Sequence, residues 1–257
     1  MLGAGKSSPV LRTKNLVKNF GGITVARNIN FSMSKGELRC LVGPNGAGKT
    51  TFFNLITGII SPSEGDIFFM ERKITNLSTH RIARLGIARS FQVPNVYSGL
   101  SVTENIHIAV QQKYKTFNPL GSSRVPDEMS SAVSRLLNSF HLTPQKDIRA
   151  SKLSHGEKRR LELAISVACE PRLLLLDEPC AGLTVAETGD VGRLIKELSS
   201  QGISILVIEH DTKFVKKIAH TITILHRGEI VAEGSPEEIE KDEYVKDIYL
   251  GGKQPWY

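Results

Sequence analysis

The stretch that decides the fold is Gly43-Pro44-Asn45-Gly46-Ala47-Gly48-Lys49-Thr50. It matches the pattern G-x-x-x-x-G-K-[ST], and it joins the apolar run LRCLVG at 38–43 to a helical pattern over 50–58. Glycines let successive backbone N–H groups point inward at a helix N-terminus, which makes a site for anions. The alternative is an ordinary glycine-rich turn, and the strand–loop–helix context argues against it. We therefore predict a nucleoside triphosphate site.

Each residue type in this loop suits one part of such a ligand. The N–H groups of Gly43, Asn45, Gly46, Gly48 and Thr51 can face the phosphates. The ammonium group of Lys49 suits the β- and γ-phosphates, and the hydroxyl of Thr50 can bind Mg²⁺.

The composition excludes several classes of protein. The 257 residues include 33 Lys+Arg and 26 Asp+Glu, a net charge of +7, and 40% are hydrophobic, so the chain is neither disordered nor fibrous. Its longest apolar runs are strand-sized, and its first residues, MLGAGKSSP, lack the apolar stretch of a signal peptide, so we expect no membrane span and no secretion signal. No basic block concentrates the positive charge, so we expect no nucleic-acid partner.

The cysteines carry no metal or redox motif. Cys40, Cys169 and Cys180 are far apart and fit no C-x-x-C spacing. A reducing compartment follows, and we expect the thiols to be small buried apolar groups.

Alternation and apolar runs predict an α/β domain. Continuous apolar runs are typical of strands that are buried on both faces of a parallel sheet. The predicted strands are an antiparallel pair at 10–34 that turns at Gly21-Gly22, single strands at 38–43, 66–70, 173–177 and 203–210, and a hairpin at 221–234. A crossover helix is expected at 185–199, and a charged amphipathic tail ends the chain.

The middle of the chain is helical in character. Ser101 and Glu104 form an S-x-x-E capping box at one helix start. Apolar residues at helical spacing predict a second helix over 129–140, and a third begins near Ser154. We therefore predict that this segment is a helical insertion within one α/β domain.

A pair of carboxylates follows the run LLLL at 173–176. Asp177 and Glu178 lie at the end of a predicted buried strand, where consecutive side chains point to opposite sides. Asp177 can hold Mg²⁺, while Glu178 can accept a proton from an attacking water. Beside the phosphate loop this role is favoured over two carboxylates that merely solvate a strand end.

Five features now stand in order: the phosphate loop, RSFQ at 89–92, LSHGE at 153–157, LLLLDEP at 173–179 and VIEHD at 207–211. This order resembles the ATP-binding subunits of ABC transporters over nearly the whole chain. The resemblance implies a P-loop NTPase (RecA-like) core with an antiparallel β subdomain and an inserted α-helical subdomain. It implies core segments at 1–95 and 165–257, separated by a helical subdomain at 96–164 that ends in the signature motif.

The resemblance also assigns further site residues. LSHGE is similar to the signature motif, with His155 where glycine is usual; Ser154 and Gly156 then face ATP that a second subunit holds in a head-to-tail dimer. By itself, Ser154 with Glu157 is only a capping box. Gln92 resembles the glutamine that touches Mg²⁺ and the water and senses the membrane partner.

His210 resembles the switch histidine near the γ-phosphate, although a single histidine at a strand end is usually structural. Phe20 occupies the place of the aromatic residue that stacks on adenine, with packing into the core as the equal alternative. Where many relatives carry aspartate, this chain has Thr184, which can hydrogen-bond across a dimer but brings no charge.

The subfamily can be narrowed by likeness. GIARSFQ, AGLTVAET, VIEHD and EYVKDIYLGG resemble ATP-binding subunits of importers of branched-chain amino acids, and LSHGE with AGLT is also similar to importers of urea or short-chain amides. The resemblance implies ATP and Mg²⁺ as cofactors, and a second ATP-binding subunit, identical or paralogous. It also implies transmembrane permease subunits, a solute-binding protein reached indirectly, and a peripheral place on the cytoplasmic face of the plasma membrane.

Two rival classes share the phosphate loop. A soluble ABC-type ATPase acting on ribosomes, DNA or protein complexes usually carries two cassettes or long coiled coils, and this chain has neither. A small-molecule kinase or GTPase does not predict LSHGE and His210 at their places.

Overall fold

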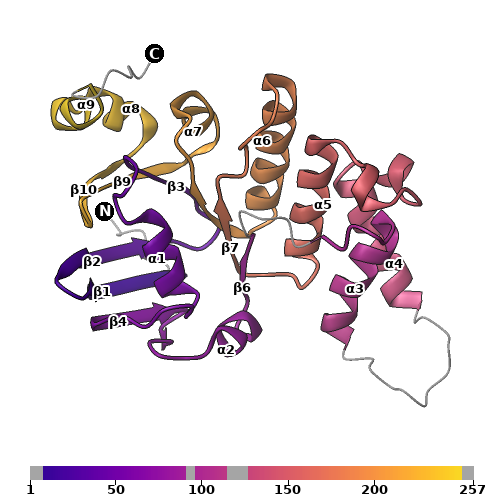
Figure 1. Cartoon of the computed structure of the whole chain (residues 1–257), viewed down its shortest axis with the longest axis horizontal. Helices are drawn as coiled ribbons and strands as arrows, with labels where there is room; N and C mark the ends of the chain where they lie inside the picture. Colours follow the sequence, from indigo (N-terminus) through magenta and orange to yellow (C-terminus); the bar gives the residue numbers. More distant parts are fainter. Residues whose placement is uncertain (1–7, 91–95, 115–126, 251–257) are drawn as a thin grey trace, which may run out of the picture.

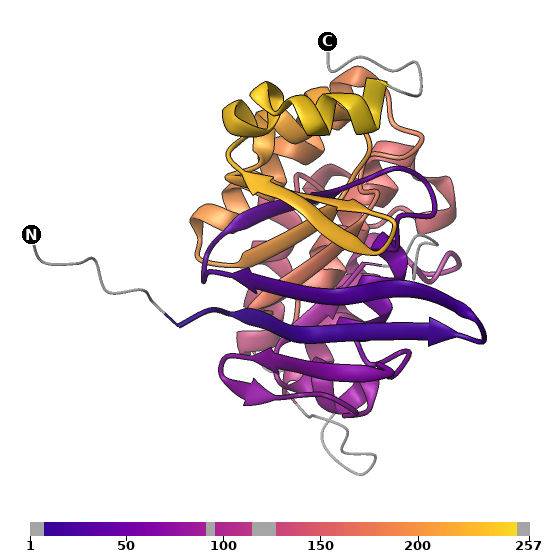
Figure 2. The ribbon, with the colours of Figure 1, turned by 90° about the vertical axis from the view of Figure 1, so that its left-hand side faces the viewer.

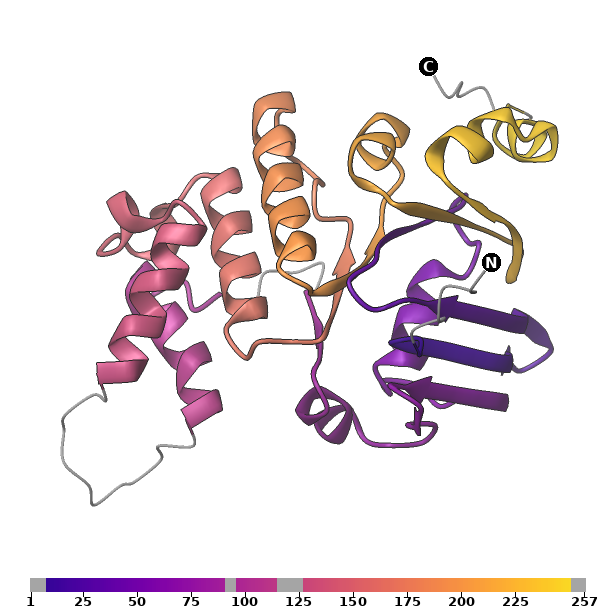
Figure 3. The ribbon, with the colours of Figure 1, turned by 180° about the vertical axis from the view of Figure 1, so that it is seen from behind.

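The chain folds as two sheets with helices around them (Figure 1). The computed structural model describes residues 8–90, 96–114 and 127–250. One sheet is antiparallel with the order β2-β1-β4-β5, and the other has six strands in the order β10-β9-β3-β8-β7-β6. Seen from behind, the antiparallel sheet lies at one end of the molecule and helices α3 and α4 at the other (Figure 3).

The six-stranded sheet is the centre of the core. Its strands are β3 (Leu38–Val42), β6 (Ile87–Arg89), β7 (Leu173–Asp177), β8 (Ser204–Ile208), β9 (Thr221–His226) and β10 (Glu229–Gly234). All neighbours pair in parallel except β9 and β10, which form the predicted hairpin.

Side chains of this sheet alternate between two hydrophobic clusters. In β7, Leu174 and Leu176 belong to the cluster under helices α3–α6, while Leu173 and Leu175 belong to the cluster under the antiparallel sheet. Because both faces are covered, the strand is apolar throughout, as the sequence predicted.

The antiparallel sheet begins with the predicted strand pair. Strands β1 (Leu11–Phe20) and β2 (Ile23–Met33) pair from Phe20↔Ile23 at the turn to Leu11↔Met33, and β4 (Glu64–Phe69) pairs with β1 on the other side. A two-residue strand, β5 (Arg72–Lys73), completes the sheet. Figure 2 shows the long β1–β2 ribbon beneath β9 and β10.

The five helices predicted from the sequence are confirmed as α1, α3, α4, α5 and α6. The helices of the described segments are α1 (Lys49–Ile56), α2 (Thr79–Arg84), α3 (Val102–Tyr114), α4 (Asp127–Ser139), α5 (His155–Val167), α6 (Val185–Ser200), α7 (Thr212–Ile218), α8 (Pro236–Lys241) and α9 (Glu243–Leu250), with short 3₁₀ turns at Thr143–Gln145 and Ala150–Lys152. Ser101 and Glu104 form the predicted capping box at the start of α3, because each accepts a hydrogen bond from the other's backbone N–H. Within the described segments, none of the helices combines the length and the apolar character that a membrane crossing requires.

The structure corrects two sequence predictions. Strand β8 ends at Ile208 rather than at 210, so Glu209 and His210 belong to the turn before α7, which Asp211 caps. Cys40 is buried as expected, but Cys169 is exposed and Cys180 is half-buried, so burial of all three thiols is wrong. Helices α2 and α7 and strand β6 were not predicted, because they are short and their apolar residues show no sustained period.

Candidate active site

The phosphate loop lies between β3 and α1, as the sequence predicted. Two of its glycines are required by the backbone around them. A Cβ at Gly43 would stand 2.1 Å from the carbonyl oxygen of Leu225, and one at Gly48, whose φ is 104°, would stand 2.8 Å from that of Val25. The loop is therefore held against β9 and β2 by close backbone contacts that no larger residue permits.

Lys49 turns its ammonium group back into the loop. Its Nζ donates hydrogen bonds to the carbonyl oxygens of Gly43 (2.6 Å) and Pro44 (3.1 Å). Burial lowers the pKa of Lys49, and the negative charges of Glu178 and Asp177 oppose that shift. A buried cation at the centre of the loop is suited to an anionic ligand. Asn45 and Thr50 are exposed beside it, and Thr51 is half-buried.

Asp177 and Glu178 have different environments. Asp177 is 5% exposed, and its Oδ2 pairs with Nη2 of Arg89 on β6 at 2.9 Å. Glu178 follows the strand with a φ of 47°, and its side chain is 29% exposed. One carboxylate is therefore fixed inside, while the other reaches the surface where water is available.

His210 lies close to Glu178. Its Nδ1 is 3.9 Å from Oε1 of Glu178 and 3.9 Å from Oε2 of Glu209, and its side chain is 68% exposed. The carboxyl ends of β3, β7 and β8 are neighbours in the sheet, which brings Lys49, Asp177, Glu178 and His210 to one edge.

The LSHGE segment starts α5 with the predicted capping box. Ser154 Oγ accepts a hydrogen bond from the N–H of Glu157, and the Glu157 carboxylate accepts one from the N–H of Ser154. The N–H of Gly156 donates to Oε1 of Glu187 at 3.1 Å. Across the segments that the structure describes, no hydrogen bond or ion pair joins this helix start to the phosphate loop.

Glu187 also caps the next helix. Thr184 is the N-cap of α6, and its hydroxyl and backbone N–H bond the Glu187 carboxylate. Those bonds to Thr184 are the main reason that the pKa of Glu187 is lowered. Within this chain, Thr184 therefore has a local structural role at the start of α6.

Two further sequence predictions have different outcomes. The ring of Phe20 is 48% exposed, with Lys18 Nζ 5.0 Å from its centroid, so packing into the core is wrong and stacking on a base stays a prediction. Gln92 lies outside the described residues.

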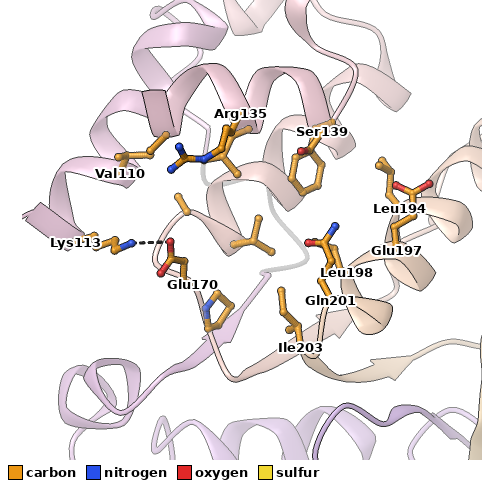
Figure 4. Close-up of a pocket in the computed structure, with 16 residues that line it drawn as sticks. Val110, Lys113, Arg135, Ser139, Glu170, Leu194, Glu197, Leu198, Gln201 and Ile203 are labelled. Atoms are coloured by element: carbon orange, nitrogen blue, oxygen red, sulfur yellow. Dashed lines mark hydrogen bonds and ion pairs between the residues drawn. The ribbon is translucent and has the colours of Figure 1, made fainter. Parts of the chain in front are cut away.

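A groove of about 820 Å³ lies beside the site. Its walls come from the end of α1, from α2 and β6, and from α3 and α5, and they include Ala88, Arg89, Ser90 and Glu162. A separate pocket of about 400 Å³ lies between α3, α4, α5 and α6 (Figure 4). None of the predicted site residues that the structure describes lines that pocket, and a Lys113–Glu170 ion pair lies at its edge.

Comparison with known families decides the identity of this arrangement. A family model described as "ABC transporter" matches residues 26–181, which include the phosphate loop, LSHGE and the Asp177–Glu178 pair. The chain belongs to the ABC transporter family.

Named relatives of this ABC chain fall in more than one transport system. It is 38% identical over 252 residues to the high-affinity branched-chain amino acid transport ATP-binding protein LivG of Salmonella typhimurium, covering 95% of this chain and 99% of LivG. It is 36% identical over 244 residues to the lipopolysaccharide export system ATP-binding protein LptB of Acidithiobacillus ferridurans, covering 95% and 98%.

Solved structures of ABC cassettes share its fold. The ADP conformation of MJ1267, an ATP-binding cassette of an ABC transporter, superposes with a TM-score of 0.82 at 29% identity, covering 95% of this chain and all of that one. A nucleotide-free ATP-binding cassette from an ABC transporter gives 0.81 at 29%, covering 94% and 98%. The P-loop NTPase fold is thereby confirmed, and this ABC chain is an ATP-binding cassette ATPase that powers transport.

Three charged residues of this ABC cassette were not predicted from the sequence. Arg89 pairs with Asp177, and Arg159 donates to the carbonyl oxygen of Pro179. Glu209 accepts the backbone N–H groups of Cys180 and His210. Only Glu209 carried a signal in the sequence, because it lies within the predicted buried strand at 203–210 and charged side chains are rarely buried unless they are paired.

Proposed function

We propose that this cassette is the ATP-hydrolysing subunit of an importer of branched-chain amino acids. Support comes from its likeness to LivG over nearly the whole of both chains. The observation that carries hydrolysis is the convergence of Lys49, Glu178 and His210 at one sheet edge. An importer of urea or short-chain amides is the second candidate, which the LSHGE and AGLT segments favour.

The phosphate loop would hold ATP through its backbone. The loop N–H groups from Gly43 to Thr51 face the phosphates, Lys49 exchanges its two carbonyl partners for phosphate oxygens, and the exposed ring of Phe20 stacks on adenine. Thr50 and Asp177 offer oxygen ligands, the donor type that Mg²⁺ prefers, and Gln92 is proposed as a third ligand. When bound, Mg²⁺ neutralises charge on the β- and γ-phosphates.

Glu178 is the proposed general base. Its carboxylate is half-buried at the edge where the γ-phosphate would lie, and His210 stands 3.9 Å away to position the phosphate and the water. The test is Glu178→Gln, which keeps the shape and removes the proton acceptor. We expect unchanged ATP affinity, a turnover lower by roughly 10²–10⁴-fold, and a trapped dimer. Turnover at the wild-type rate would refute the assignment.

Two copies, identical or paralogous, would enclose each nucleotide. Ser154 and Gly156 lie at a capped helix N-terminus, where anions are favoured, and in the described part of the chain no hydrogen bond joins them to the phosphate loop. We propose that they bind ATP held by the other subunit. Ser154→Arg should then block dimer closure and leave nucleotide binding to the monomer intact; unchanged ATPase activity would contradict this pairing.

The groove beside β6 is the proposed docking surface for a permease subunit. It lies between the core and the helices of the 96–164 insertion, and Ser90 in its wall leads directly into the segment that contains Gln92. Docking there would place the cassette on the cytoplasmic face of the plasma membrane, with 1–95 and 165–257 forming the ATPase core.

The transported solute is tested in the assembled transporter. The cassette is purified with its membrane subunits in mild detergent, and ATPase activity is measured with binding proteins loaded with leucine, urea or no solute. Stimulation by the leucine-loaded protein alone supports the proposal. Stimulation by urea alone favours the second candidate, and co-purification of lipopolysaccharide-export subunits would overturn both.

A further inference from the structure

The backbone at Glu178 adopts a conformation that needs support. Its φ is 47°, in the left-handed region that residues with a side chain rarely enter. One hydrogen bond, from the N–H of Glu178 to the carbonyl oxygen of Ile208 (2.9 Å), ties the residue to β8. Such strained positions persist only where the surrounding structure holds them, so the contacts of residues 177–180 decide where the Glu178 carboxylate points.

Arg159 on α5 holds this segment from one side. Its Nε–H donates to the carbonyl oxygen of Pro179 at 2.7 Å, and its Nη2 donates to that of Asp177 at 3.4 Å. Its Nη1 is paired with Oε2 of Glu162, one turn along the same helix, at 2.6 Å. The Arg159 side chain is 11% exposed and that of Glu162 is 8% exposed, so this pair fixes the guanidinium inside the protein.

Glu209 holds the segment from the other side. Its Oε1 accepts the N–H of Cys180 at 2.9 Å, and its Oε2 accepts the N–H of His210 at 3.2 Å. Glu209 is 1% exposed. The carbonyl of Pro179 and the N–H of Cys180 belong to the same peptide unit. Arg159 and Glu209 therefore bind opposite ends of the peptide group that follows Glu178 and Pro179.

We infer that Arg159, fixed by Glu162, is a positioning residue for the general base Glu178. The inference rests on the proposed role of Glu178. Arg159 and Glu162 lie on α5, which starts at His155 directly after its cap Ser154, the residue proposed to bind the other subunit's nucleotide. Glu162 also lines the groove beside β6.

The test removes the ion pair as a unit. Arg159→Met alone would leave the Glu162 carboxylate buried without its partner and destabilise the protein, whereas R159M/E162L replaces both charges by apolar groups of similar volume. We expect this variant to fold, to bind Mg-ATP within about threefold of wild type, and to lose about 100-fold in kcat, since a misplaced catalytic group costs about that much. Glu162→Gln keeps an oxygen that accepts the Arg159 hydrogen bond, so we expect its kcat within about threefold of wild type.

A matched control comes from the neighbouring helix. Asp190 and Arg193 form the same kind of i, i+3 pair on α6, but their side chains are 51% and 72% exposed. D190L/R193M makes the same change in charge and should leave both kcat and ATP affinity unchanged. All variants are assayed as the isolated cassette, so loss of a membrane partner cannot explain the result.

The outcomes separate this inference from the proposed function. If wild type hydrolyses ATP, Glu178→Gln does not, and folded R159M/E162L retains the wild-type kcat, the inference is overturned and the function stands. A parallel loss of ATP affinity and kcat in R159M/E162L would also overturn it, because that result indicates a general structural role. Failure of Glu178→Gln to change turnover refutes the proposed role of the base itself.

Discussion

Removal of the Arg89 side chain should destabilise the protein strongly. Arg89 Nη2 pairs with Asp177 Oδ2 at 2.9 Å, and Nη1 donates to Asn54 Oδ1 at 2.6 Å, which links β6 and β7 to α1. The side chains of Arg89 and Asp177 are only 8% and 6% exposed. Water therefore cannot replace the lost partner in Arg89→Met, and the Asp177 carboxylate stays buried without its counter-ion.

The magnitude follows from that burial. Breaking a buried ion pair by removing one partner costs about 3–5 kcal/mol in the free energy of unfolding. At about 2–4 °C per kcal/mol for a chain of this size, the melting temperature should fall by roughly 6–20 °C. The double variant R89M/D177N leaves neither charge of this pair behind, so it should be more stable than R89M by at least about 1 kcal/mol.

The assay is urea unfolding of the isolated cassette, without nucleotide, followed by circular dichroism. Arg193→Met is the control, because the Arg193–Asp190 pair is exposed and its loss should cost less than about 1 kcal/mol. Equal stability of R89M and R89M/D177N would refute the reasoning. A loss in R89M no larger than that in R193M would do the same.

Three further predictions concern the loop, the thiols and the pH dependence. Gly43→Ala should lower the free energy of unfolding by about 1–3 kcal/mol and abolish retention of ATP on a filter, because the new Cβ would stand 2.1 Å from the backbone oxygen of Leu225. Gly22→Ala is the control: nothing lies within 4 Å of its Cβ, so its free energy of unfolding should stay within about 0.5 kcal/mol of wild type. In peptide mapping after iodoacetamide treatment, the exposed Cys169 should be modified first, and the buried Cys40 should stay unmodified until the protein unfolds. Because burial raises the pKa of Cys169, its thiolate, the reactive form, increases at higher pH and the modification should become faster there. Burial raises the pKa of Glu209, so the folded protein keeps this proton to a higher pH than the unfolded chain does. The free energy of unfolding should therefore fall as pH rises from about 4.5 through the raised pKa. Glu209→Gln cannot titrate there, so it should flatten this part of the plot of stability against pH.

The parts of the site that depend on local chain geometry could be predicted from the sequence. The phosphate loop needs glycine where backbones touch, and a carboxylate pair after LLLL marks the end of a buried strand. Parallel strands then bring their carboxyl ends together without further information. The predicted positions of Lys49 after one buried strand and of Asp177 and Glu178 at the end of another are confirmed, and the sheet order brings these strand ends to one edge.

The supporting contacts could not be predicted, because they join residues that are distant in sequence. Arg89 and Asp177 are 88 positions apart and meet only because β6 pairs with β7, and β6 is too short to show a strand pattern. Arg159 reaches Pro179 across 20 positions through the packing of α5 against the core. The sequence predicted a helix from about Ser154, but it gave no sign that Arg159 and Glu162 form a largely buried ion pair on it.

The charge near Thr184 could not be predicted from that one position, because a carboxylate is supplied by Glu187. The sequence drew attention to the missing carboxylate at Thr184, yet Thr184 caps α6 and a carboxylate lies three residues later, on Glu187. That carboxylate accepts the N–H of Gly156, one of the donors proposed to face the other subunit's nucleotide. A phosphate and Glu187 are both acceptors and both negative, so they cannot share this donor. Closure of the proposed dimer on ATP therefore requires the Glu187 side chain to leave Gly156, which connects the cap of α6 to nucleotide binding at the start of α5.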